Sequence, residues 1–243
     1  MHFTKHLLLD LLQLSKANEE IALESIAERN NLSLGQTYQL ISALNEETEA
    51  KLEFNTSSVR IPQKFKTPLI IKAIETGIDI DQIIEMLHWR DFESFCLTVF
   101  EYHEFQNIQN FHFTQNRKRY EIDVVTVKEP LIFTVDAKLW KTGHAGALKT
   151  VVENHSNRTN AFSQYLAKPL NRQKFQLKNS QAIRIIPLII TSKMYEIQIF
   201  HEMPIIPFFK LNGFITDIHN FLGSLQQFPI KIRTQKTLLS FRT

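Results

Sequence analysis

The stretch that decides the fold is Tyr120-Glu121-Ile122-Asp123-Val124-Val125, followed after a short break by Val135-Asp136-Ala137-Lys138. Both segments are rich in β-branched and apolar residues, so we expect two neighbouring strands joined by a tight turn at Lys128-Glu129-Pro130. Side chains alternate between the two faces of a strand, which places Asp136 and Lys138 on one face. The opposite face is apolar and is predicted to enter the core, with Leu131, Phe133, Val135 and Ala137.

A mixed sheet with helices on both faces is predicted around these two strands. The sequence indicates a helix over residues 91–105, strands over 108–115, 119–127 and 131–138, a helix over 145–167, strands over 183–190 and 204–211, and a helix over 213–226. This order is typical of an α/β domain. Pro187 lies inside the expected 183–190 strand and cannot donate a ladder hydrogen bond, so we expect an edge position or a bulge there.

The first third of the chain is predicted to be mainly helical. Leucines recur at helical spacing over residues 7–14, a second helix is expected from Ile21 to Asn30, and Ser33 is expected to cap a third that runs to about Glu47. Residues 54–61 look extended, and residues 68–87 indicate two short helices, the second opened by Asp79 or Asp81. The helix-turn-helix rhythm followed by extended segments resembles a winged-helix domain. We therefore divide the chain into a small, mainly α winged-helix domain at residues 1–66, a helical connector at 67–89 and an α/β domain at 90–243.

The role of the winged helix is left open by its charges. Such domains usually lay their third helix in the major groove of DNA. Here that helix, residues 34–47, contains no lysine or arginine, and Glu46, Glu47 and Glu49 would repel phosphates. One interpretation is a protein-interaction or dimerisation domain. The other is contact with DNA through Arg60, Lys64 and Lys66.

Composition excludes several classes of protein. A chain of 243 residues with 43% hydrophobic content can bury a substantial core. The single cysteine, Cys96, rules out an intramolecular disulfide, and we expect neither a membrane span nor a signal peptide, hence a cytoplasmic protein. No glycine-rich loop for a nucleotide cofactor, no histidine spacing typical of zinc and no nucleophile elbow is present in the sequence.

Charge is distributed unevenly along the chain. Residues 1–53 hold nine acids and four bases, whereas the remainder holds sixteen acids and twenty-four bases, which favours a polyanionic partner. Basic residues gather at 117–119, at 168–178 and at 231–236. The last two groups can equally be an ordinary solvated surface. The first directly precedes the Asp123 strand and would lie near any phosphate bound there.

Four side chains are candidates for metal-assisted chemistry. Asp123 lies inside a strand, where aspartate is disfavoured, and Glu93 has apolar helical neighbours. Mg²⁺ takes oxygen ligands, often one or two carboxylates plus phosphate oxygens, so Asp123, Asp136 and the Ala137 carbonyl would form a partial shell. Lys138 would orient the attacking water. The alternatives are an edge-strand aspartate, an Asp136–Lys138 ion pair and a helix N-terminal acid at Glu93.

In this order of motifs, residues 88–211 resemble the PD-(D/E)XK nuclease superfamily and, within it, the Mrr-like restriction endonucleases. Glu93 matches the glutamate of the first core helix, Asp123 the first aspartate, and Asp136-Ala137-Lys138 the acid-x-lysine motif. The resemblance implies a restriction-endonuclease-like fold and Mg²⁺-dependent cleavage of DNA, with Mn²⁺ as a substitute. It also implies action on foreign or modified DNA, or in repair or junction cleavage, by a homodimer. Metal would be held by Asp123, Asp136, Glu93 and Ala137, and the catalytic set would be Glu93, Asp123, Asp136 and Lys138.

One position departs from the family pattern. Many members have a glutamine on the helix after the lysine strand, where this chain offers His155, on a predicted inward stripe that a core histidine would suit equally well. Gln164 would match only in a different register. DNA-binding residues are expected at Arg117, Lys118, Arg119, Lys141, His144 and Arg158. The alternative function is a non-catalytic DNA- or protein-binding factor on a nuclease-like scaffold.

Overall fold

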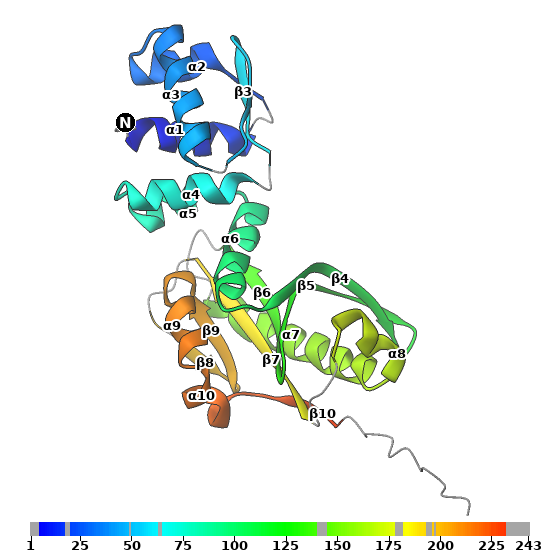
Figure 1. Cartoon of the computed structure of the whole chain (residues 1–243). Coiled ribbons are helices and arrows are strands. Elements are labelled where there is room, and N and C mark those ends of the chain that lie inside the picture. Colours follow the sequence, from blue (N-terminus) through cyan, green and yellow to red (C-terminus); the bar gives the residue numbers. More distant parts are fainter. Residues whose placement is uncertain are drawn as a thin grey trace, which may run out of the picture. The chain divides into compact units, whose positions relative to one another are not determined.

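The computed structural model describes residues 5–17, 20–48, 50–62, 65–139, 145–177, 182–192, 196 and 198–231 (Figure 1). The chain divides into two compact units, Met1–Cys96 and Leu97–Thr243. The expected connector at residues 67–89 therefore belongs to the first unit. The division itself falls within one helix, α6 (Trp89–Tyr102).

The first unit combines short strands with helices. Its described elements before α6 are α1 (Lys5–Ala17), β1 (Glu20–Ala22), α2 (Leu23–Asn30), α3 (Leu34–Glu47), β2 (Glu53–Phe54), β3 (Ser58–Arg60), α4 (Lys66–Glu75) and α5 (Ile80–Met86). The three strands form an antiparallel sheet in the order β1-β3-β2. The expected helix from Ile21 starts two residues late, because Ile21 pairs with Val59 in this sheet.

The helix starts of this unit follow the capping rules. Ser33 caps α3 as predicted, and Gln36 completes a capping box with it. Asp79 caps α5 by accepting a hydrogen bond from the Asp81 N–H. Both contacts satisfy backbone donors that an exposed helix end would otherwise leave to water.

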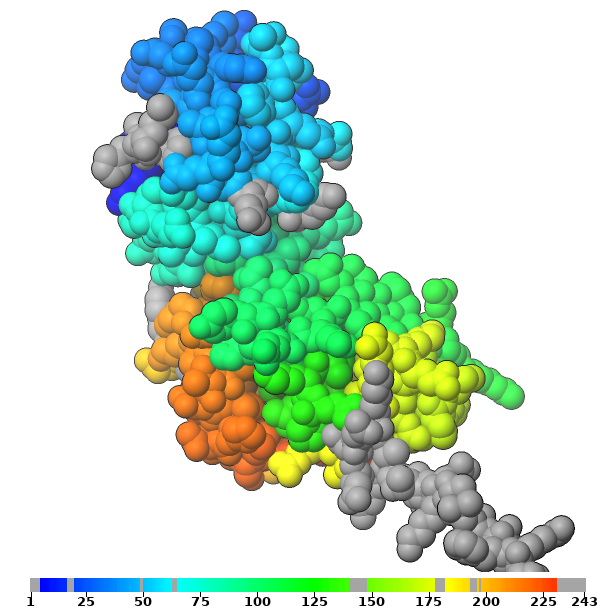
Figure 2. Space-filling model, in the orientation of Figure 1, coloured from blue at the N-terminus to red at the C-terminus, as the bar shows by residue number. Residues whose placement is uncertain are grey.

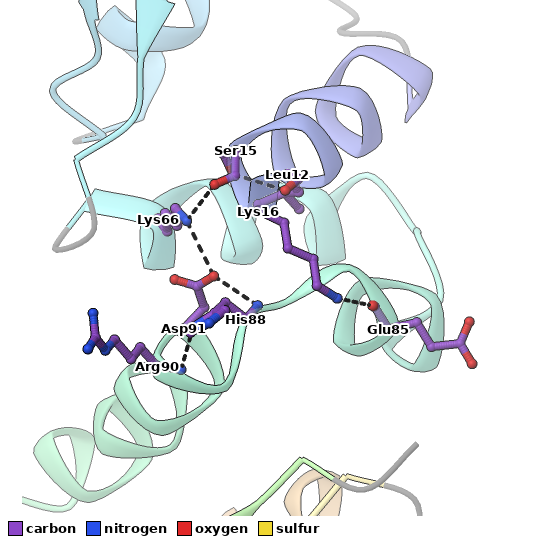
Figure 3. A network of polar contacts seen from close by, with 8 residues as sticks. All are labelled: Leu12, Ser15, Lys16, Lys66, Glu85, His88, Arg90 and Asp91. Carbon is purple, nitrogen blue, oxygen red and sulfur yellow. Dashed lines mark hydrogen bonds and ion pairs between the residues drawn. The ribbon is translucent and has the colours of Figure 1, made fainter. Parts of the chain in front are cut away.

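A buried ion pair ties three helices of the first unit together (Figure 3). The Lys66 ammonium donates to the Ser15 carbonyl at 3.1 Å and lies 3.3 Å from Asp91 Oδ2. The same oxygen accepts the His88 N–H at 3.0 Å. Lys66 is 7% exposed and Asp91 3% exposed. The interpretation in which Lys66 contacts DNA is therefore wrong for this residue, since its charge is paired inside the unit. Lys64 lies outside the described residues.

The second unit is built on a seven-stranded mixed sheet. Its order is β4-β5-β6-β7-β9-β8, with β10 also paired to β7. The β6–β7 and β7–β9 pairs are parallel and the others antiparallel, which confirms a mixed α/β arrangement. The strands are β4 (Gln106–Gln115), β5 (Lys118–Lys128), β6 (Leu131–Lys138), β7 (Ala182–Thr191), β8 (Gln198–Phe200), β9 (Met203–Pro207) and β10 (Phe228–Lys231).

The second unit's described α-helices flank this sheet. They are the last turns of α6, then α7 (Ala145–Leu166), α8 (Pro169–Arg172), α9 (Leu211–Thr216) and α10 (Ile218–Phe221). The expected strand over 204–211 ends at Pro207, where a 3-10 turn and α9 follow. The expected helix over 213–226 is broken between α9 and α10 and ends in a further turn, so both of these boundaries were wrong.

Pro187 lies in the interior of the sheet, so the expected edge position is wrong. On one side β7 pairs with β6 along its length. On the other side β10 pairs with residues 182–185 and β9 with residues 189–191. Pro187 falls in the gap between these two partners. A strand can accept proline at this position because neither β9 nor β10 pairs with it there, so the proline nitrogen need not donate a ladder hydrogen bond to them.

Aromatic side chains fill both faces of the sheet. On one face Phe133 packs near Phe100 of α6 and Phe105, with ring centroids 6.0 and 5.6 Å away. On the other face α7 lies along the sheet, and Phe162 meets Phe111 of β4. The 3-10 turn after α8 joins this cluster. In Figure 2 the yellow surface of this part of the chain adjoins the green surface of the residues that precede it. None of the helices in the described part of the chain is long and apolar enough to cross a membrane.

Candidate functional site

The two predicted aspartates come together across neighbouring strands. Strands β5 and β6 are antiparallel, and Val124 lies opposite Val135. One further step of this register brings Asp123 opposite Asp136. The two carboxyl groups share a side-chain hydrogen bond, which lowers the pKa of Asp136. The prediction that Asp123 and Asp136 come from neighbouring strands is therefore confirmed.

Asp136 is a buried carboxylate held by two cations. The residue is 1% exposed. Lys138 Nζ lies 2.7 Å from Oδ1, and Arg158 Nη2 donates to Oδ2 at 3.0 Å. Both cationic side chains are about one third exposed, at 31% and 28%. A buried charge requires such partners, because an isolated carboxylate would be neutralised instead.

The net electrostatic effect keeps Asp136 ionised. Burial raises the pKa of its carboxyl, as desolvation does for any acid. Neighbouring groups lower that pKa by more, so that it lies well below its usual range. They are the His155 ring in its charged form, Asp123 through its hydrogen bond, and the cations Lys138 and Arg158. Because the pKa of His155 is about 4, its ring is neutral near pH 7. At that pH we therefore attribute the charge stabilisation to the two cations.

His155 is anchored in the core beneath the site. It belongs to the inward stripe of α7, with Val152, Thr159 and Phe162, as the sequence predicted. Its Nε2–H donates to the Thr134 carbonyl at 2.8 Å. Burial lowers the pKa of His155 to about 4, although the Asp136 charge opposes this shift. Its Nδ1 is buried and has no hydrogen-bond partner among the described residues. This position matches a core histidine, whereas Gln164 is exposed.

A cavity of about 440 Å³ opens beside Asp136. Its walls come from the start of β5, the end of β6 and the outer face of α7. Four cationic side chains line it: Lys118, Arg119, Lys138 and Arg158. The remaining lining residues are Tyr120, Glu121, Asp136, Val151, Asn154 and Asn157. Cations outnumber acids on these walls, so the cavity suits an anionic ligand.

The basic cluster at 117–119 is presented by a tight hairpin. Asn116 and Arg117 both have left-handed backbones, with φ of 51° and 63°. Gln115 pairs with Lys118, so these two residues form the whole loop, the geometry that suits the twist of paired strands. Lys118 and Arg119, the first two residues of β5, both line the cavity, while Arg117 lies exposed at the tip and does not line it. Lys141 and His144 lie outside the described residues.

Glu93 occupies a different unit from this cavity. It lies half-buried on α6, in Met1–Cys96. Burial raises the pKa of the Cys96 thiol, and the nearby Glu93 charge raises it further. Among the residues that the structure describes, no group of three His, Cys, Asp or Glu side chains is placed to hold a metal ion. Of the four predicted catalytic residues, Asp123, Asp136 and Lys138 belong to the second unit.

The remaining donors fit a hard divalent ion. Lys138 contacts Asp136 Oδ1 and Arg158 contacts Oδ2, so a divalent ion would share this carboxylate with the two cations. Asp123 is beside it, and Ala137, the last residue but one of β6, is half-buried. Mg²⁺ commonly takes one or two carboxylates and completes its shell with waters and phosphate oxygens. Asp136, which lines the cavity, and the adjacent Asp123 could supply those carboxylates.

Five lining residues were not predicted from the sequence: Tyr120, Glu121, Val151, Asn154 and Asn157. Asn154 and Asn157 stand three residues apart on α7, with Arg158 one turn after Asn154, so all three share one polar face. That spacing is a signal which could have identified them. Tyr120 gave no such signal, because its ring stacks on Phe113, 5.3 Å away, as a core aromatic would.

The chain has a distant relative of unassigned activity. It is 27% identical over 139 residues to an uncharacterized protein of Archaeoglobus fulgidus, a match that covers 56% of this chain and 96% of that protein. No protein family matches the chain, and no solved structure does. Function must therefore be argued from the geometry of the cavity.

Proposed function

We propose that the second unit hydrolyses phosphodiester bonds in DNA with the help of Mg²⁺, which Mn²⁺ would replace. One observation carries the proposal: the buried Asp136 carboxylate, beside Asp123 and in contact with Lys138, opens onto a cavity lined by four cations. An acid pair offers ligands to a metal, and the surrounding cations offer ligands to a phosphate. A purely structural ion pair would need no such cavity.

The order of elements supports the resemblance to PD-(D/E)XK nucleases. Helix α6, strands β4, β5 and β6, helix α7 and strand β7 follow one another along the chain, and the expected motif residues fall on α6, β5 and β6. The first unit, with α1-β1-α2-α3-β2-β3, supports the winged-helix interpretation in the same way. A cytoplasmic, Mrr-like enzyme of restriction or repair remains our proposal, and because cutting both strands takes two active sites, a homodimer is proposed as well.

Each side chain of the cavity has a defined task in this proposal. Bound Mg²⁺ would activate a water and neutralise charge that develops on the phosphate. Lys138 lies next to Asp136 and is partly exposed to the cavity, so it can orient that water. Lys118, Arg119 and Arg158 bind phosphate oxygens. The role expected for Glu93 stays a prediction.

Base stacking contributes little to recognition in this cavity. The Tyr120 ring has Phe113 on one side, and Lys118 Nζ lies 5.1 Å from its centre. Asn154 and Asn157 supply amides, and the other polar groups are charged. Recognition through the phosphate backbone, without strong dependence on base sequence, follows from this lining.

A non-catalytic binding factor is the second candidate. It is favoured by one observation, that Lys138 and Arg158 already neutralise Asp136 in the structure. A binding protein would use the same basic cavity for DNA and would leave the acid as an internal ion-pair partner.

Cleavage assays on supercoiled, linear and single-stranded DNA with Mg²⁺, Mn²⁺ or chelator separate the two. We expect metal-dependent cleavage that Asp136→Ala reduces by at least about 10³-fold, because the metal supplies several kcal/mol of the rate. DNA binding by this variant should be retained. Asp217→Ala changes an exposed aspartate of the same unit outside the cavity and is the matched control, with activity unchanged. Absence of cleavage of every DNA form with either metal would favour the binding factor.

A further inference from the structure

The guanidinium of Arg158 stands between the two ligands that the cavity is proposed to bind. It donates to Asp136 Oδ2 at 3.0 Å and lines the cavity with its exposed side. Its Nε is buried and has no hydrogen-bond partner within the described part of the chain. Guanidinium groups bind phosphate best with two parallel N–H donors. The group thus has one donor on the acid and another still to be satisfied.

We propose that Arg158 couples metal binding to phosphate binding: it holds Asp136 while no phosphate is present and leaves it for a phosphodiester in the cavity. The inference rests on the proposed function and adds an order of events to it. Nucleic acid is bound first, and the acid pair becomes a competent metal site as a result.

The physical basis is competition for one buried carboxylate. Asp136 has two oxygens, and in the structure a cation contacts each of them. A divalent ion approaching Asp136 meets two positive charges in a poorly solvated place, so repulsion weakens its binding. When a phosphate oxygen attracts the guanidinium, Oδ2 is released and the local positive charge is compensated. Lys138 can remain, since a single ammonium at Oδ1 leaves the other oxygen accessible.

Coupling of this kind is reciprocal. If phosphate increases the affinity for the metal by a given factor, the metal must increase the affinity for phosphate by the same factor. Arg158 is the residue through which metal binding and phosphate binding are linked. Among the four cations that line the cavity, Arg158 and Lys138 alone contact Asp136. Arg184 serves as the matched control, since it is an exposed arginine of the same unit, on β7, and does not line the cavity.

Titration of the whole chain with Mn²⁺, by calorimetry or by electron paramagnetic resonance, tests the coupling without any measurement of cleavage. Sodium sulfate serves as the tetrahedral anion, with ionic strength matched by sodium chloride. For the natural chain we expect sulfate to tighten Mn²⁺ binding about tenfold, within the usual range of such couplings. Arg158→Ala should bind Mn²⁺ about tenfold more tightly without sulfate and show no further gain with it. Arg184→Ala should leave both the sulfate-free Mn²⁺ affinity and the sulfate response unchanged.

Two further variants make the outcome decisive. Arg158→Gln keeps a neutral donor for Asp136 and should resemble Arg158→Ala in losing the sulfate effect, which guards against a folding defect in one variant. The inference is overturned if both Arg158 variants bind Mn²⁺ as the natural chain does, or keep its sulfate response. The proposed function fails separately, if the natural chain binds no Mn²⁺ or if Asp136→Ala binds it equally well.

Discussion

Two buried aspartates, one in each unit, show how differently the same ion-pair chemistry can be used. In the first unit Asp91 pairs with Lys66, whose side chain is only 9% exposed, and both are surrounded by protein partners (Figure 3). In the second unit Asp136 is equally buried, but its cations are about one third exposed and border a cavity. Buried charge alone does not identify a functional site.

The difference lies in what is left unsatisfied. Around Asp91 the ammonium has a carbonyl and a carboxylate, and the carboxylate has a backbone N–H besides. Around Asp136 two buried nitrogens have no hydrogen-bond partner among the described residues, His155 Nδ1 and Arg158 Nε. A buried polar group without a partner costs about 1–3 kcal/mol, so an unpaired donor on Arg158, which lines the cavity, indicates a place that awaits a ligand.

The sharpest test of this comparison is to remove the cation from the closed pair. Lys66→Met leaves the Asp91 charge buried, and we expect a loss of about 3–5 kcal/mol in the free energy of unfolding. Urea denaturation followed by circular dichroism measures it. The double change Lys66→Met with Asp91→Leu should recover most of the loss, while Lys16→Met, at a surface contact with the Glu85 carbonyl, should cost little. A small effect of Lys66→Met would mean that the pair is not the structural element proposed here.

The corresponding change in the open pair should affect chemistry far more than stability. Lys138→Met leaves Arg158 on Asp136, so we expect under about 1 kcal/mol of lost stability, as for partly exposed ion pairs. Cleavage with Mg²⁺ should fall about 10²–10³-fold, the effect of removing one preorganised charge. Lys149→Met, on the exposed side of α7, is the control and should retain activity. Equal activity of the two variants would remove Lys138 from the proposed catalytic set.

The third difference is a dependence of stability on pH that arises from His155, beneath the open site. Burial lowers the pKa of His155 to about 4 from an ordinary 6.5, so between these values the unfolded chain binds a proton that the folded chain does not. Stability is therefore full above pH 6.5 and decreases as pH falls towards 4, by about 3 kcal/mol in total. Asp136, whose pKa is lowered, adds a further loss only at lower pH. Denaturation curves from pH 7 to 4 should lose this slope in His155→Gln. An unchanged slope would show that other groups cause it.

Much of the local structure could be predicted because its causes are local. The cap at Ser33, the cap at Asp79 and the three consecutive strands follow from residue type and periodicity within a few positions. Errors arose where distant pairing decided. Ile21 lies in a strand because it pairs with Val59. Pro187 is tolerated inside the sheet because β10 pairs with β7 before this residue and β9 pairs with β7 after it.

The candidate site likewise has features that local sequence predicted and features that depend on distant contacts. Sequence spacing alone determined that Asp136 and Lys138 share a face of one strand, and that His155 belongs to the inner stripe of its helix, because side-chain direction follows from the period of each element. Only the tertiary structure decided that Arg158, twenty-two positions away, contacts Asp136, that Lys66 is buried, and that four cations meet around one cavity. Contacts between elements depend on how sheet and helix pack, and periodicity within a single element carries no information about that distance.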